Sequence, residues 1–292
     1  MSIIRFILYL LKHGSFSVRT ENFEDYHENI LRDIPSYKSR KSNNLYNKIR
    51  RKFVRHQLTG AWIGNFAYVK RLKRTRRQNF YIDSLRLCYV RIFKSASTSV
   101  LREIIPLIDP SVDKKILTDL QIDILANSYV TTHAATNEKE FKYFTLVRNP
   151  FHRLVSVYLD LFDAANLFFP YQSYLFGILK QDMSFSEFVQ ALSKIPEPLL
   201  APHFCSQYTI IENLKERINF FRIEKDHNAL MGFLNAFSIS IDHSNKNRNP
   251  YDYRNFYTPE ILQAAYTLYQ QDVEKFDYRQ EYRELLEWVN GK

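Results

Sequence analysis

Two segments that share one pattern, a strand followed by a short turn and a helix, constrain the fold of this chain most. In the first, residues 85–93 alternate β-forming and aromatic side chains, and residues 98–105 have the spacing of a helix that Pro106 is expected to end. In the second, residues 142–147 predict a strand, and Pro150 suits the first turn of the helix that follows. Two such units predict a parallel sheet flanked by helices.

Later segments extend the same architecture. Ser184 and Glu187 form a capping-box pattern at the start of a helix, and residues 258–276 predict a long helix opened by a threonine and a proline. Residues 218–223 predict another short strand. The whole indicates a three-layer α/β domain.

The composition permits one substantial core. The chain has 292 residues with 45% hydrophobic content, so we expect one main domain, residues 81–292, and a basic, partly helical lead-in, residues 1–80, packed on it. The 41 Lys and Arg exceed the 31 Asp and Glu and give a charge of +10, which attracts nucleotides, acidic glycans, nucleic acid or anionic lipid. Much of the excess lies within residues 38–55 and 70–77, and such runs are more often solvated faces than binding sites.

The loop that joins the first strand to its helix, Phe93 to Ser99, has the features of a phosphate cradle. Backbone N–H groups and the helix dipole converge at such a place, Lys94 adds a positive charge, and the hydroxyls of Ser97, Thr98 and Ser99 can donate to phosphate oxygens. The alternative is a simple helix cap beside a surface lysine. A nucleotide-hydrolysing P-loop is disfavoured because the lysine comes first and the loop has no glycine.

The order strand, lysine, then small and hydroxyl residues resembles the 5′-phosphosulfate loop of the carbohydrate sulfotransferases, whose usual form is P-K-T-A-G-T-S. The match covers four residues and departs at Phe93, where proline is usual, and at Ser97, where glycine is usual. The resemblance implies that the loop binds the donor 3′-phosphoadenosine 5′-phosphosulfate (PAPS) through Lys94, Ser95, Ala96, Ser97, Thr98 and Ser99.

The second unit, residues 144–156, resembles the 3′-phosphate segment of the same family. Arg148 and Ser156 fall on the two places that grip the 3′-phosphate. A guanidinium makes a two-pronged contact with a phosphate, and a serine two turns into the next helix can reach the same group. Two motifs in the right order are far more specific than either one.

The resemblance covers about residues 85–280. His203 and Gln207 lie in a segment similar to one that lines the acceptor cleft, and residues 245–278 look like the C-terminal stretch that closes over the nucleotide. The family implies a three-layer, P-loop-NTPase-like sulfotransferase fold with a central, mostly parallel sheet.

The function that this resemblance implies is transfer of a sulfuryl group from PAPS to a hydroxyl of a carbohydrate, either a glycan or a polysaccharide, with 3′,5′-ADP as product and no metal. Lys94 would neutralise the leaving 5′-phosphate. The candidate general base is His133, which follows a β-rich run, and a half-buried structural histidine is the alternative. Three glutamates are weaker candidates for the base: Glu103, Glu138 and Glu140.

Two rival functions come from other classes. A basic nucleic-acid-binding protein would explain the N-terminal charge but neither anion motif, so no nucleic-acid partner is expected. A catalytically inactive nucleotide- or glycan-binding module would keep the fold, and the departures at Phe93 and Ser97 favour it.

The cysteines and the N-terminus bear on location. Cys88 and Cys205 are the only cysteines, so we expect no disulfide framework and a reducing compartment. The apolar stretch 3–11 is well short of the ~20 residues that span a bilayer, and no small-residue cleavage site follows it. Eukaryotic Golgi sulfotransferases carry a membrane anchor that this sequence does not show, which favours a bacterial, cytoplasmic enzyme. Loose peripheral membrane attachment through the N-terminal residues is the alternative.

Overall fold

A four-stranded sheet forms the centre of the protein. The computed structural model describes residues 77–131, 138–162, 178–179, 183–241 and 251–291. The strands lie in the order β1-β2-β3-β4, with β2, β3 and β4 parallel and β1 antiparallel to β2. Their bounds are Gln78–Ile82 for β1, Leu87–Arg91 for β2, Lys142–Val147 for β3 and Ile218–Arg222 for β4. The predicted parallel sheet is thereby confirmed, with an antiparallel edge strand in addition.

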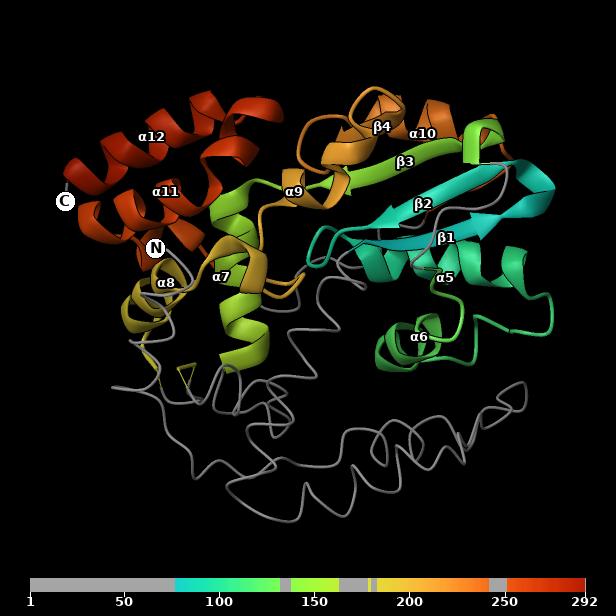
Figure 1. Ribbon diagram of the computed structural model, residues 1–292, viewed down its shortest axis with the longest axis horizontal. Coiled ribbons are helices and arrows are strands. Elements are labelled where there is room, and N and C mark those ends of the chain that lie inside the picture. Colours follow the sequence, from blue (N-terminus) through green and yellow to red (C-terminus); the bar gives the residue numbers. More distant parts are fainter. Residues whose placement is uncertain (1–76, 132–137, 163–177, 180–182, 242–250, 292) are drawn as a thin grey trace, which may run out of the picture.

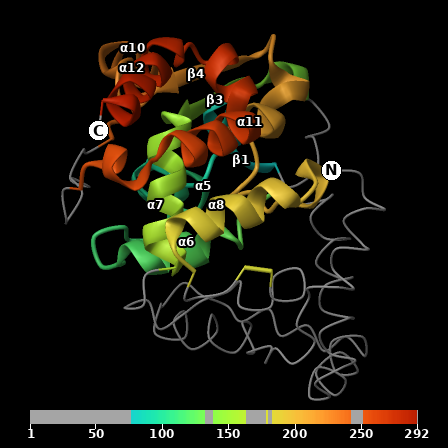
Figure 2. The ribbon, with the colours of Figure 1, turned by 90° about the vertical axis from the view of Figure 1, so that its left-hand side faces the viewer.

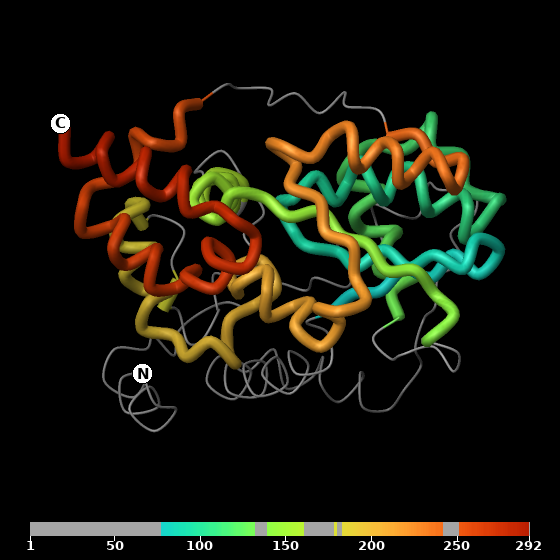
Figure 3. The backbone as a smooth tube through the Cα atoms, turned by 90° about the horizontal axis from the view of Figure 1, so that it is seen from above, coloured from blue at the N-terminus to red at the C-terminus, as the bar shows by residue number. Residues whose placement is uncertain are grey.

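Helices cover both faces of this sheet, as expected for three layers. They are α5 (Ser97–Ile108), α6 (Asp119–Ala126), α7 (Pro150–Phe162), α8 (Phe185–Lys194), α9 (Gln207–Ile211), α10 (His227–Asn235), α11 (Pro259–Lys275) and α12 (Arg279–Asn290). The strands β2 and β3 point toward the half of the molecule that holds α7, α9, α11 and α12 (Figure 1). Figures 2 and 3 show the same grouping of the C-terminal helices at this end of the sheet.

The alternation of side chains along β2 divides the apolar interior in two. Leu87 and Tyr89 pack with residues of α5, α6 and α10 on one face of the sheet. Cys88 and Val90 pack with residues of α7, α8, α9, α11 and α12 on the other. All four side chains are fully buried, as expected for a central strand covered on both faces. Cys88 and Cys205 are buried and form no disulfide.

Most predicted helix boundaries are confirmed. Ser184 caps α8 in a capping box with Glu187, and Thr258 caps α11. The prediction that Pro106 ends the first helix is wrong, because α5 continues to Ile108 with the proline inside it. A proline so close to the end removes only one hydrogen bond of the last turn.

The segment before His133 also differs from its prediction. In place of a β-rich run beside the two motif strands, the chain forms the helix α6 and a turn. Thr131 then makes a single antiparallel bridge with Asn79, on the edge strand β1. The C-terminal end of α6 and this bridge therefore replace a regular strand.

The first strand begins before the expected domain boundary. β1 starts at Gln78, so the boundary near residue 80 falls inside the sheet. Of the lead-in, residues 1–76 lie outside the described residues. Across the described part of the chain, no helix combines the length and apolar character needed to cross a bilayer.

Candidate active site

The loop after β2 bends through two left-handed residues. Lys94 has φ of 65° and Ala96 has φ of 55°, and α5 begins at Ser97. As the N-cap residue, Ala96 offers no side-chain acceptor to the first turn of α5. Alternating backbone conformations of this kind gather N–H groups into a concave anion-binding surface. The left-handed residues of this loop are therefore Lys94 and Ala96. Ser97, which stands where glycine is usual, is the first residue of α5.

The ammonium of Lys94 contacts α7. Its Nζ lies 2.5 Å from Oδ2 of Asp160, with 24% of the lysine side chain and 51% of the aspartate side chain exposed. The predicted phosphosulfate-binding lysine is thus held by a carboxylate in this structure.

Thr98 faces a different partner from the one expected. Its hydroxyl donates to both carboxylate oxygens of Asp123 on α6, at 3.0 Å each. The guanidinium of Arg91 binds the same carboxylate, with 2.7 Å between Nη2 and Oδ1. The hydroxyl therefore fastens α5 to α6.

Arg148 lies at the end of β3, beside the first loop. Its side chain is buried, Nη1 donates to the carbonyl of Lys94 at 3.2 Å, and Nη2 lies 2.7 Å from Nε2 of His152. Its Nε is buried without a hydrogen-bond partner among the described residues. Burial lowers the pKa of this guanidinium below its ordinary value. The two strand-end loops, which the sequence predicts to bind opposite ends of one nucleotide, are thus in direct contact.

His152 completes the surroundings of Arg148. Because a guanidinium can only donate, Nε2 of His152 must accept, and the imidazole is neutral. Burial and then the charge of Arg148 lower the pKa of His152 to about 4, against a smaller opposing effect of Asp252. The ring stacks on that of Tyr253, with 4.8 Å between centroids.

One face of α7 carries contacts to both loops. His152, Ser156 and Asp160 follow one another at intervals of four residues, which places them on the same side of a helix. His152 binds Arg148 at one end of this face, and Asp160 binds Lys94 at the other. Ser156, partly exposed, lies between them. This face of α7 therefore runs alongside both predicted phosphate sites.

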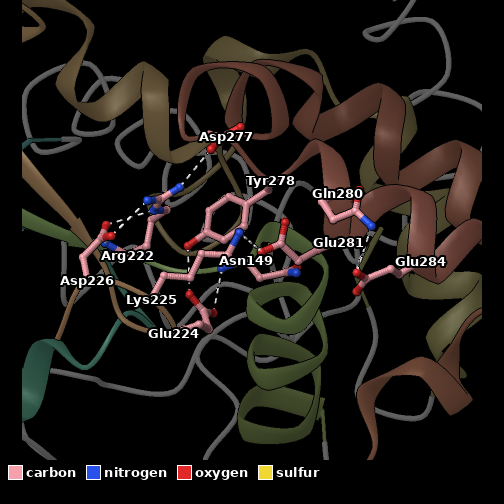
Figure 4. Close-up of polar contacts among 10 residues, drawn as sticks. All are labelled: Asn149, Arg222, Glu224, Lys225, Asp226, Asp277, Tyr278, Gln280, Glu281 and Glu284. Carbon is pink, nitrogen blue, oxygen red and sulfur yellow. Dashed lines mark hydrogen bonds and ion pairs between the residues drawn. The ribbon is translucent and has the colours of Figure 1, made fainter.

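The start of α7 is fixed by Asn149 and by the C-terminal helices. Oδ1 of Asn149 accepts from the N–H groups of Phe151 and His152, which caps the helix. The backbone N–H of Asn149 donates to Glu224, whose other oxygen accepts from the hydroxyl of Tyr278 (Figure 4).

The strand end of β4 is fixed in the same region. Arg222 forms a fork with Asp226 and reaches Asp277 at 3.1 Å, and Lys225 pairs with Glu281 on α12 at 2.5 Å (Figure 4). These contacts hold the loop that follows β4 against the connection between α11 and α12.

Arg153 is a buried residue to which sequence reasoning assigned no role. Its Nε donates to the carbonyl of Phe93 at 2.9 Å. The two terminal nitrogens donate to the carbonyls of Pro202, His203 and Cys205. With 1% of its surface exposed, Arg153 ties the segment 202–205 to the residue before Lys94. An arginine between apolar positions of a predicted helix was the available signal.

His203 and Gln207 occupy different environments. The half-buried ring of His203 lies 3.9 Å from that of Phe93, between centroids. Burial, followed by the charges of Lys94, Arg91 and Arg153, sets the pKa of His203 well below its ordinary value, so the ring is neutral. Gln207, in the segment expected to line the acceptor cleft, is completely buried, and its amide contacts both strand-end loops.

The sequence model of the sulfotransferase family matches residues 77–279, from the residue before β1 to the first residue of α12. The chain belongs to the sulfotransferase family. No curated protein and no solved structure matches it.

The candidates for the general base of this sulfotransferase fall in three places. His133 lies outside the described residues, as does the side chain of Glu138. Glu140 pairs with Arg86 at 3.5 Å, before the start of β2 and therefore at the opposite end of the strand from Lys94. A five-residue strand is roughly 16 Å long, too far for a shared reaction centre. Glu103, on α5, forms an ion pair with Lys114.

Within the described ranges, no group of three or more His, Cys, Asp and Glu side chains is placed to hold a metal ion.

Proposed function

We propose that this sulfotransferase transfers a sulfuryl group from PAPS to a hydroxyl of a carbohydrate. The observation that carries the proposal is the contact between Lys94 and Arg148 at the carboxyl ends of the neighbouring parallel strands β2 and β3. A donor with anionic groups at both its 5′ and 3′ positions matches two adjacent cationic loops. The family supports sulfuryl transfer in general, and the carbohydrate acceptor rests on the form of the two motifs.

Two observations fit an anion at these loops. The buried Nε of Arg148 has no partner among the described residues, and it is a donor that a phosphate oxygen can satisfy. The first turn of α5 receives no side-chain cap from Ala96, whereas α7 is capped by Asn149. The positive end of α5 is therefore the one suited to a phosphate.

The residues divide the work of binding and proton transfer. Lys94, with the N–H groups of Ser95 to Ser99, would hold the 5′-phosphosulfate and stabilise charge that develops on the phosphate. Arg148 and Ser156 would hold the 3′-phosphate. When bound, PAPS would supply the sulfuryl group and leave as 3′,5′-ADP. His133 would accept the proton of the acceptor hydroxyl, and the neutral His203, near Lys94, would contact the acceptor.

Calorimetric titration with 3′,5′-ADP and 5′-AMP tests the donor. Contacts between a charged group and a phosphate contribute roughly 1.5–3 kcal/mol each, so 3′,5′-ADP should bind at least about tenfold more tightly. Arg148→Ala should remove most of the difference, and Arg279→Lys on the exposed side of α12 should keep it. Equal affinities in the unaltered protein would refute the assignment, and salt-dependent RNA binding without affinity for 3′,5′-ADP would favour a nucleic-acid-binding protein.

Transfer assays test the acceptor and the base. Sulfate from PAPS should appear on glycans or polysaccharides and not on simple phenols. His133→Ala should lower kcat by roughly 10²–10⁴-fold while binding of 3′,5′-ADP persists. Tight binding of 3′,5′-ADP without transfer to any carbohydrate would instead indicate an inactive nucleotide-binding module.

A further inference from the structure

The amide of Gln207 joins the two strand-end loops. Its Oε1 accepts from the hydroxyl of Ser95 at 3.1 Å and from the backbone N–H of Arg148 at 3.0 Å. Its Nε2 donates to the backbone carbonyl of Arg148 at 2.7 Å. One buried side chain therefore binds the residue after Lys94 and both main-chain groups of Arg148.

A buried carboxylate on α11 fixes this amide from behind. Asp272 accepts from the hydroxyl of Ser206 at 2.6 Å and from the N–H groups of Gln207 and Tyr208 at 2.9 and 2.8 Å. Its Oδ2 also lies 3.4 Å from Nε2 of Gln207. Both side chains are completely buried.

The network permits only one orientation of the amide. Oε1 faces two donors, from Ser95 and Arg148, and Nε2 faces two acceptors, from Arg148 and Asp272. A flipped amide would set donor against donor and acceptor against acceptor. Gln207 therefore holds the loops at a defined separation, with all four of its hydrogen-bonding positions used.

We propose that Gln207 is a positioning residue that sets the distance between the 5′-phosphosulfate site and the 3′-phosphate site. The inference rests on the proposed function, because it assumes one nucleotide that carries both anionic groups. When the loops are held at the matching distance, binding of one phosphate places the other phosphate at its site. The two phosphates therefore contribute more to the affinity together than the sum of their separate contributions. Gln207 itself touches neither phosphate.

The test is a thermodynamic cycle over four ligands. Calorimetry gives the Kd of adenosine, 5′-AMP, adenosine 3′-phosphate and 3′,5′-ADP, and the cycle yields the coupling between the two phosphates. In the unaltered protein we expect a coupling of about tenfold. Gln207→Met keeps the side-chain length and removes every hydrogen bond of the side chain. The coupling should therefore fall to about twofold or less, while 5′-AMP and adenosine 3′-phosphate each keep their affinity within about twofold.

A control variant accompanies this test, and different results would overturn the positioning role and the proposed function. Gln280 is an exposed glutamine of α12 that donates to Glu284 (Figure 4), and Gln280→Met should leave the coupling intact. Unchanged coupling in Gln207→Met, or an equal loss for all phosphorylated ligands, overturns the positioning role. Failure of the unaltered protein to prefer 3′,5′-ADP over both singly phosphorylated nucleotides overturns the proposed function instead.

A second variant covers a failure of Gln207→Met to fold. Gln207→Glu keeps the size and the accepting oxygen, but removes the donor to the carbonyl of Arg148 and sets a second carboxylate beside Asp272. The same cycle should again give reduced coupling with singly phosphorylated nucleotides still bound. Full coupling in this variant would overturn the inference.

Discussion

The carboxylate of Asp160 holds the ammonium of Lys94, with 2.5 Å between the two charged atoms. Under the proposed function, a phosphate at the adjacent loop needs the same ammonium, so the aspartate would compete with the donor. Removing the competitor should strengthen donor binding. An ion pair this exposed contributes about 0.5–1 kcal/mol, so Asp160→Asn should lower the Kd of 3′,5′-ADP roughly twofold to fivefold in calorimetric titration.

A similarly exposed ion pair away from the loops provides the control. Asp119 pairs with Arg102 at 2.6 Å, and Asp119→Asn should leave the Kd of 3′,5′-ADP unchanged. Weaker binding in Asp160→Asn would show instead that the carboxylate orients Lys94 for the donor.

Because the imidazole of His152 is neutral in the folded protein, we expect the protein to lose stability in acid. The pKa of His152 is about 4 in the folded protein and near 6.5 when unfolded, so between these values the unfolded chain binds a proton that the folded chain refuses. Stability therefore falls as the pH drops from about 6.5 to 4. His152→Gln, which retains an acceptor for Arg148, should reduce the loss between pH 7 and 5 by about 1 kcal/mol in urea unfolding, after allowance for partial exposure.

The comparison with His227→Gln isolates this effect, since His227 is exposed on α10. That variant should follow the unaltered protein at every pH. An identical pH dependence for His152→Gln would mean that the imidazole takes up a proton as readily in the folded protein as in the unfolded chain, and that its contact with Arg148 differs from the one described.

We expect the loss of the Thr98 hydroxyl to lower the stability of the protein without changing its affinity for the nucleotide. This hydroxyl is engaged by Asp123, so Thr98→Val should lower the free energy of unfolding by about 1.5 kcal/mol and change the Kd of 3′,5′-ADP by less than about twofold. Urea unfolding and calorimetry measure the two. Thr267→Val, at an exposed threonine of α11, is the matched control. A large loss of affinity with normal stability would place the hydroxyl on the phosphate, as the sequence suggests.

Arg153 predicts that even a charge-preserving change is costly. Its planar guanidinium reaches four carbonyls from three nitrogens, and an ammonium on a flexible stem cannot match that arrangement. Arg153→Lys should lower the free energy of unfolding by about 3 kcal/mol or more, because buried carbonyls lose their donors. Arg279→Lys, at the surface, should change it by less than about 0.5 kcal/mol. Equal effects of the two would contradict the buried network.

The local elements could be predicted wherever a short-range signal decided the structure. The β-rich run 142–147 coincides with β3, and Pro150 begins α7, because the strand composition and the helix-start proline act within a few residues. Pro106 was misleading because a helix tolerates the loss of one hydrogen bond near its end. The bridge between Thr131 and Asn79 depends on two distant segments, and no local pattern indicates it.

The site divides in the same way. The motifs identified the loops of Lys94 and Arg148, and the structure brings these two residues into contact. The supporting residues Gln207 and Asp272 could not be paired from sequence, since their contact requires α9 and α11 to meet. A weak signal existed at Asp272, an acidic residue beside the apolar positions Tyr269 and Val273 of a predicted helix. The two loops could thus be predicted from the sequence, whereas the hydrogen-bond network that fixes their separation could not.

The long-range origin of this network has a consequence for the order of folding. The sheet register pairs Tyr143 with Ile218, and the buried carboxylate of α11 reaches back to the start of α9. Contacts between distant segments close large loops and form slowly compared with helices. The loops of Lys94 and Arg148 are therefore expected to reach their final separation late in folding. Under the proposed function, a newly made chain would bind a doubly phosphorylated nucleotide only once its C-terminal helices have docked, so binding of that ligand would report complete folding.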